Sequence, residues 1–247
     1  MILLSIIIST FIVSFISLTG IIFLIISKDI FEKLLFFLIS LAAGALIGGS
    51  LLHLMPHSLE KIEPLSSFWI FILGFVSFFL LERILRWRHC HEFDCPIHPV
   101  TYLSLIGDSI HNFIDGVVIA SSFLINFHFG IITTLIVLAH ELPQELSDYA
   151  ILVYGGMGKI KALFFNFITG LTSFIGGVAG YFFLRSENLI FYILPFVAGN
   201  FFYISASDLI PELHNETNLK KSINSFLFFI SGIFLISFLK LISKNNI

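Results

Sequence analysis

Eight apolar stretches of about 20 residues or more dominate this sequence, and they decide what the chain can fold into. They cover roughly residues 2–27, 31–55, 65–85, 102–125, 129–153, 160–184, 189–211 and 223–242. About 20 mostly apolar residues in an α-helix cross the hydrocarbon core of a bilayer. The first stretch is longer than the core of a signal peptide, so it counts as a span. We therefore predict an all-α, polytopic membrane protein with eight transmembrane helices.

The amino-acid composition is typical of a membrane protein. Of the 247 residues, 57% are hydrophobic and only 12% are charged, whereas soluble domains carry about 25% charged residues. A formal net charge of −3 gives no sign of the basic face that nucleic-acid binding requires. Two cysteines provide no disulfide framework. Because the stretches are joined by short connections, we predict one membrane domain over residues 1–247.

Positive charges gather in alternate connections, which predicts the orientation. If the first connection is cytoplasmic, nine of the 13 Lys and Arg residues lie on that side. Both termini then lie outside the cytoplasm. We expect a multi-pass protein of the cell membrane, either a plasma membrane or a bacterial inner membrane.

Charged and polar side chains interrupt the fourth and fifth stretches at their centres. Each charge at a helix centre costs about 2.5–3.5 kcal/mol on insertion scales, so such residues need a compensating partner. The fourth and fifth stretches carry Asp108, His111, Asn112, Asp115, His140, Glu141, Gln144, Glu145 and Asp148.

Spacing predicts that these side chains converge. The two helices are joined by a tight turn near Asn126, so they run antiparallel. Asp115 and His140 lie about 12 and 13 residues from Phe127, which places them at one depth to within a few ångströms. His140 and Gln144 share a helix face, since residues four apart do. Imidazoles and carboxylates at one depth are typical of a site for zinc or a neighbouring first-row cation.

Pro143 adds a second reason to expect an ion path, because it removes one helical hydrogen bond and frees the Ala139 carbonyl. Two other interpretations use the same residue types. Single intramembrane polar residues often form helix–helix hydrogen bonds, and buried carboxylates and imidazoles also form proton relays.

The strings HNFIDG at residues 111–116 and HELPQE at residues 140–145 resemble motifs of the ZIP family of divalent-metal transporters. One branch of that family has HNxxDG on helix four and HExPHExGD on helix five. The end of the second stretch, LLHLMPH at residues 51–57, is similar to that branch as well. The resemblance covers the whole chain.

The resemblance implies import of zinc, or of iron or manganese, through a two-metal centre between helices four and five. His111, Asp115, His140 and Gln144 match the family's first metal position. Asn112 and Glu141 match the family's second metal position, and Gln144 is a third candidate ligand at that position. It also implies a homodimer that moves by an elevator-type motion, with no organic cofactor. Gln144 stands where the branch has His, so Glu145 is an alternative ligand, and Ser147 replaces its Gly.

Further residues are candidates for the metal pathway. Helix seven ends in SDLIPELH, which resembles the family's DxxPE and places Asp208, Glu212 and His214 on an exit path or at a solvated membrane interface. His53 and His57 form a candidate entry funnel, and Asp108 and Asp148 line the path or bond to backbone. The connection at 86–101 is either a metal-acceptor patch or an ordinary polar loop; its candidate ligands are His89, Cys90, His91, Cys95 and His98.

An enzymatic function is the main alternative. His140–Gln144, HELPQ, is one residue short of the HExxH pattern in which two histidines bind zinc and the glutamate is the general base. Gln144 removes one of those ligands, and Pro143 bends the helix that would present them. We therefore expect a transporter and not an intramembrane zinc hydrolase.

Overall fold

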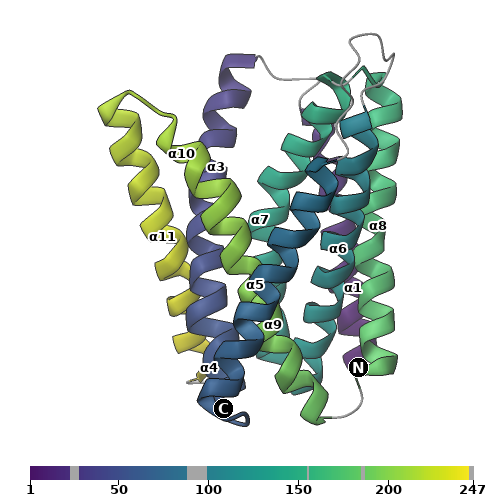
Figure 1. The fold of residues 1–247 in the computed structure, drawn as a ribbon, viewed down its shortest axis with the longest axis vertical. Coiled ribbons are helices and arrows are strands. Elements are labelled where there is room, and N and C mark those ends of the chain that lie inside the picture. Colours follow the sequence, from purple (N-terminus) through teal and green to yellow (C-terminus); the bar gives the residue numbers. More distant parts are fainter. Residues whose placement is uncertain (23–27, 88–98, 155, 185–186, 245–247) are drawn as a thin grey trace.

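A computed structural model describes residues 1–22, 28–87, 99–154, 156–184 and 187–244. Within these ranges the chain forms eight helical rods and no strand, which confirms the all-α class. The rods run along the long axis of one bundle (Figure 1). In chain order they are α1 (Ile2–Ile16) with η1 (Ser17–Ile21); α3 (Lys28–Gly48) with η2 (Gly49–Leu54) and α4 (Met55–Leu59); α5 (Pro64–Trp87); α6 (Pro99–Ile125); α7 (Phe127–Tyr154); α8 (Lys159–Phe183); α9 (Glu187–Ile204) with η3 (Ser205–Leu209) and α10 (Ile210–His214); and α11 (Leu219–Lys244).

Six rods are long and apolar enough to cross a membrane: the first three, α8, the rod that contains α9, and α11. The helices α6 and α7 are equally long, at 27 and 28 residues, but carry the polar side chains described above through their centres. They lie inside the bundle, with α6 packed most extensively against α8. The first helix starts and α11 finishes at the same end of the bundle (Figure 1).

Pairs of glycines let three pairs of helices cross at backbone contact. In each pair, the position of a glycine's missing Cβ lies against the carbonyl oxygen of the residue three before its partner glycine. Only glycine allows such an approach, and it permits weak Cα–H···O contacts as well as dense packing. The pairs are Gly116 with Gly176 between α6 and α8, Gly44 with Gly232 between α3 and α11, and Gly74 with Gly199 between α5 and α9.

The rods built on α3 and α9 are related by a reciprocal pair of hydrogen bonds. Ser50 Oγ donates to the Ala198 carbonyl at 2.7 Å, and Ser205 Oγ donates to the Ala43 carbonyl at 2.9 Å. Each serine therefore bonds to the carbonyl seven residues before the other serine. This reciprocity is the mark of an approximate two-fold axis between the two rods.

The same relation is visible in the sequence, as SLLHLMPH at residues 50–57 and SASDLIPE at residues 205–212. Each serine lies in a π-helical turn, η2 or η3, and the short α-helix that follows each turn has a proline as its second residue. The proline has no N–H to donate, so the wider π turn upstream accommodates the lost hydrogen bond. As a result the second and seventh rods continue past the predicted apolar stretches, to Leu59 and His214.

Candidate metal centre

The turn between α6 and α7 sets the register of the polar side chains on these two helices. Asn126 is its connecting residue, and Asn126 Oδ1 accepts a hydrogen bond from the Phe129 N–H at 2.8 Å, which caps the start of α7. Because the helices then run antiparallel and in contact, residues at about the same distance from the turn lie at about the same depth near mid-bundle.

Four side chains meet at that level: His111 and Asp115 from α6, and His140 and Glu141 from α7. One nitrogen or oxygen from each lies within 4.8 Å of all the others, and all four residues are buried. His140 Nε2 is 3.0 Å from Asp115 Oδ2, and His111 Nε2 is 3.1 Å from Glu141 Oε1. The two Nε2 atoms are 3.2 Å apart. We call these four residues the α6–α7 cluster.

The tautomer of His140 follows from its second ring nitrogen. His140 Nδ1 lies 3.0 Å from the Ile136 carbonyl oxygen, which can only accept a hydrogen bond. In the neutral ring Nδ1 therefore carries the proton, and Nε2 presents its lone pair to the cluster. Metal-binding histidines in proteins are oriented in this way, by a backbone carbonyl that holds the other nitrogen.

Several buried oxygens near the cluster have no hydrogen-bond donor. Within the described residues, Asp115 Oδ1, Glu141 Oε2, Asp108 Oδ2 and Asn112 Oδ1 lack a hydrogen-bond partner, and Asp115 Oδ2 and Glu141 Oε1 face the histidine Nε2 atoms. Buried polar atoms in native proteins are almost always satisfied, so a cluster of unsatisfied acceptors calls for an explanation. An arrangement of oxygen and imidazole acceptors around a small space suits a divalent cation.

Glu145 lies beside the α6–α7 cluster and is bound by amides. Its Oε2 accepts a hydrogen bond from Asn166 Nδ2 at 2.6 Å, and its Oε1 accepts a longer one of 3.5 Å from Asn112 Nδ2. Asn112 Nδ2 also donates to Asp108 Oδ1 at 2.9 Å. Asn166 belongs to α8 and was not among the predicted site residues, because one asparagine in an apolar helix carries no spacing signal.

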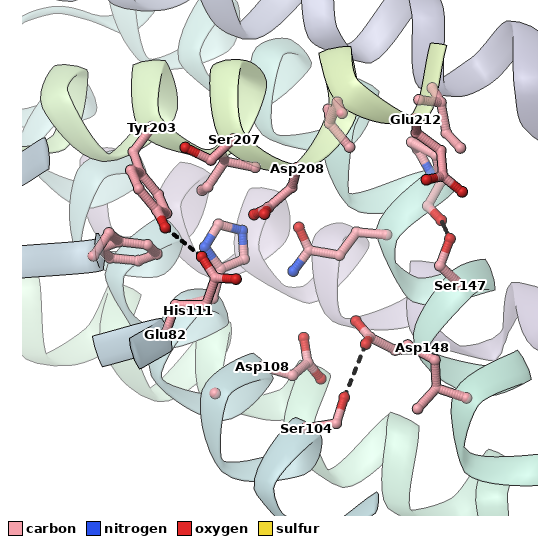
Figure 2. A pocket seen from close by; sticks show the side chains of 18 of the residues that line it. Glu82, Ser104, Asp108, His111, Ser147, Asp148, Tyr203, Ser207, Asp208 and Glu212 are labelled. Atoms are coloured by element: carbon pink, nitrogen blue, oxygen red, sulfur yellow. Dashed lines mark hydrogen bonds between the residues drawn. The ribbon is translucent and has the colours of Figure 1, made fainter. Parts of the chain in front are cut away.

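A cavity of about 760 Å³ leads from the cluster toward the end of the bundle that holds α10. Figure 2 shows His111 at its inner wall and the carboxylates of Asp108, Asp148 and Asp208 around the open space. Gln144 and Glu212 also line it. Asp148 Oδ1 accepts a hydrogen bond from Ser104 at 3.1 Å.

Two further residues of this cavity were not predicted. The Tyr203 hydroxyl of α9 donates to Glu82 Oε2 of α5, and both side chains line the cavity (Figure 2). Each looks ordinary in the sequence: a tyrosine within an apolar helix, and a glutamate near the polar end of another. Only the packing of α5 on α9 brings them together.

The predicted entry residues His53 and His57 lie near the α4 end of the second rod, at the end of the bundle away from α10. His53 is buried, shares a hydrogen bond of 3.0 Å with Thr133 Oγ1, and stacks on the Phe129 ring at 4.0 Å. His57 stacks on the same ring at 4.4 Å and lies 3.6 Å from Glu60. His214 is exposed in α10. The loop candidates His89, Cys90, His91, Cys95 and His98 lie outside the described residues.

Comparison with known proteins agrees with this arrangement. A family model described as ZIP Zinc transporter matches residues 2–94 and 88–240. The chain is 38% identical over 136 residues to zinc transporter foi of Drosophila melanogaster, which covers 55% of this chain and 19% of the relative. It is 30% identical over 216 residues to zinc transporter ZIP13 of Pongo abelii, covering 79% of this chain and 64% of the relative.

A third relative is an uncharacterized zinc transporter of Schizosaccharomyces pombe, 42% identical over 133 residues, with coverage of 49% of this chain and 29% of that protein. The chain thus spans less than two thirds of the length of each of these three relatives. The family model, in contrast, covers nearly all of this chain, including both polar helices. The chain belongs to the ZIP zinc transporter family.

Proposed function

We propose that this protein carries a divalent cation across the membrane and that the α6–α7 cluster binds the cation on the way. The observation that carries the proposal is the convergence of His111, Asp115, His140 and Glu141, in which each carboxylate has one oxygen against an imidazole nitrogen and a second without a donor among the described residues. Two buried carboxylates beside neutral imidazoles leave a local charge of −2, which a divalent cation offsets. A structural pair would be satisfied by protein donors instead.

A second cation position next to the first is consistent with the neighbouring acceptors. Asn112 Oδ1 and Asp108 Oδ2 have no hydrogen-bond partner among the described residues, and Glu141 can face both positions. Gln144 lines the cavity at this level and offers a neutral amide oxygen. Glu145 is the weaker candidate, because its two oxygens already accept hydrogen bonds from Asn112 and Asn166.

The path runs through the cavity toward α10. Asp148, Asp208 and Glu212 line this cavity and provide oxygen ligands for a cation that leaves the cluster. His53 in η2 and His57 in α4 would line the entry from the opposite membrane surface. The loop histidines and cysteines at 89–98 are proposed to accept the cation in the cytoplasm.

Zinc is the cargo that the donor set and the relatives favour. Two imidazole nitrogens with carboxylate oxygens suit zinc and its first-row neighbours, so iron and manganese remain competitors. The three relatives named above are zinc transporters. They give no support to the hydrolase alternative, in which the Glu141 carboxylate would activate water.

We propose import, with both termini outside the cytoplasm of a cell membrane. The distribution of Lys and Arg supports this orientation, since it places the α10 end of the bundle in the cytoplasm. In a background without Cys90 and Cys95, a cysteine at Lys161 should react only with cytoplasmic thiol reagents and one at Glu63 only with external reagents. Reversed labelling would reverse the direction of transport. The homodimer implied by the family is tested by the mass of the purified protein in detergent.

The experiment for the transport proposal is cation uptake into proteoliposomes that contain the purified protein. We expect zinc uptake by the wild type and none above background for His111→Ala or His140→Ala, because each variant loses one of two imidazole ligands. His128→Ala is the matched control, since His128 lies in the first turn of α7 and is exposed. Wild-type uptake by correctly inserted His140→Ala would refute the proposal. Parallel runs with manganese, iron and cadmium give the selectivity.

A further inference from the structure

Asn200, close to the C-terminal end of α9 and near the middle of the rod that continues to His214, is a buried amide that the mechanism above does not use. Its side chain is 1% exposed, and neither its nitrogen nor its oxygen has a hydrogen-bond partner among the described residues. An amide left unsatisfied in an apolar surrounding destabilises the folded protein. A helix core would be more stable with an apolar residue at this position.

The position of Asn200 on α9 directs it to the cavity and the cluster. Tyr203 and Ile204, three and four residues further along, both line the cavity, and residues at these spacings share a helix face. Phe201, the next residue, has its ring 5.2 Å from the His140 ring. Asn200 therefore lies one turn deeper than the cavity lining of α9, at the level of the α6–α7 cluster.

The approximate two-fold relation provides an independent observation. Asn200 stands five residues before Ser205, and Ala45 stands five residues before Ser50 in the related rod. The preceding residues, Gly199 and Gly44, make the same close helix contact in the two halves. Ala45 is fully buried. The methyl group of Ala45 therefore fills the equivalent position in the related rod, so helix packing alone does not require the Asn200 amide.

We propose that the Asn200 carboxamide is part of the cargo site, where it hydrogen-bonds to a water molecule held by the divalent cation. This inference rests on the proposed function. It adds a contact from α9 to a site otherwise built from α6 and α7. The amide is neutral and can both donate and accept, so it orients water on the cation without adding charge to a site that already holds two carboxylates.

The test is Asn200→Ala, measured in two ways on the purified protein in nanodiscs. Without cation, the midpoint of thermal unfolding should rise by about 2–4 °C, because an unsatisfied amide is replaced by the residue found in the related rod. In a zinc titration, Kd should increase about tenfold, which is the lower end for loss of an outer-shell partner of a bound metal. Asn200→Ala should therefore unfold at a higher temperature than the wild type and bind zinc more weakly.

Asn166→Ala is the matched control, because Asn166 is an equally buried asparagine whose amide donates hydrogen bonds to Glu145 and Ser17. Its unfolding midpoint should fall. If Asn200→Ala also lowers the midpoint, or binds zinc as tightly as the wild type, the inference is wrong while the proposed function stands. If the wild type itself binds no zinc, or His140→Ala binds it unchanged, the proposed function is wrong as well.

Discussion

Substitution of Gly176 by alanine should weaken zinc binding by the α6–α7 cluster, although Gly176 is not a member of the cluster. A Cβ at Gly176 of α8 would lie 2.0 Å from the Phe113 carbonyl oxygen of α6, and ordinary contact begins at 3.4 Å. The helices must therefore separate by about 1.4 Å at this point. Phe113 stands between His111 and Asp115 in the sequence, so both cluster residues of α6 move with its backbone.

The expected effect has two parts. Overpacking a dense helix contact costs about 1–3 kcal/mol, so the free energy of unfolding should fall by that amount. Binding sites hold their ligands to within about 0.5 Å, and a shift of about 1.4 Å exceeds this tolerance. We expect the Kd for zinc to increase at least about tenfold, as measured by calorimetric titration of the purified protein.

Two control substitutions separate the effect on stability from the effect on zinc affinity. Gly44→Ala would place a Cβ 1.9 Å from the Phe229 carbonyl oxygen, at the crossing of α3 and α11. It should cost similar stability and leave zinc affinity within about twofold of wild type, because neither helix carries a cluster residue. Gly158 has no atom within 4 Å of a Cβ, so Gly158→Ala should leave zinc affinity unchanged, and as the N-cap of α8 it should lose only the small stability of a glycine cap. Equal zinc affinity in Gly176→Ala and wild type would refute the link between this crossing and the site.

Three further substitutions test other parts of the account. Gln144→His should tighten zinc binding and slow its release, because imidazole is a better zinc donor than a neutral amide; unchanged affinity and uptake rate would place residue 144 away from the cation. Asn166→Leu should lower the free energy of unfolding by about 1–3 kcal/mol, because Glu145 loses its shortest hydrogen bond; denaturation at wild-type stability would contradict this. Glu63→Gln should be less stable than wild type at pH 7, since backbone N–H groups at the start of α5 hold the pKa of the Glu63 carboxyl below its ordinary value. That stabilisation is present above the ordinary pKa and is lost as the pH falls through the lowered one. Thermal unfolding of both proteins over an acidic pH series should converge, and a constant difference would argue against the cap.

The sequence was most informative where polar residues interrupt apolar helices in a regular way. Two charged helices joined by a tight turn predict that Asp115 and His140 share a depth, and the structure has them 3.0 Å apart. The i, i+4 spacing within each helix provides the rest of that argument. The assignment of this cluster as a cation site stays a prediction until a cation is measured there.

Contacts between side chains of helices that are far apart in the sequence could not be predicted from the sequence. Asn166 and Asn200 are single amides in apolar helices, and the spacing of neighbouring residues does not reveal what they face. Tyr203 and Glu82 meet only because Gly74 and Gly199 let α5 and α9 approach closely. The repeat of Ser-x-x-His/Asp-x-x-Pro-His/Glu is too short to be recognised in the sequence alone, and the reciprocal serine hydrogen bonds reveal it.

The central claim is that the cargo is held by side chains of α6 and α7. X-ray absorption at the zinc edge of the zinc-loaded wild-type protein tests it most directly, because it reports the atoms bound to the metal. We predict two imidazole nitrogens at about 2.0–2.1 Å with oxygen ligands and no sulfur, and one imidazole fewer in His140→Ala. A sulfur shell at about 2.3 Å would instead place the zinc at Cys90 and Cys95 and contradict the account.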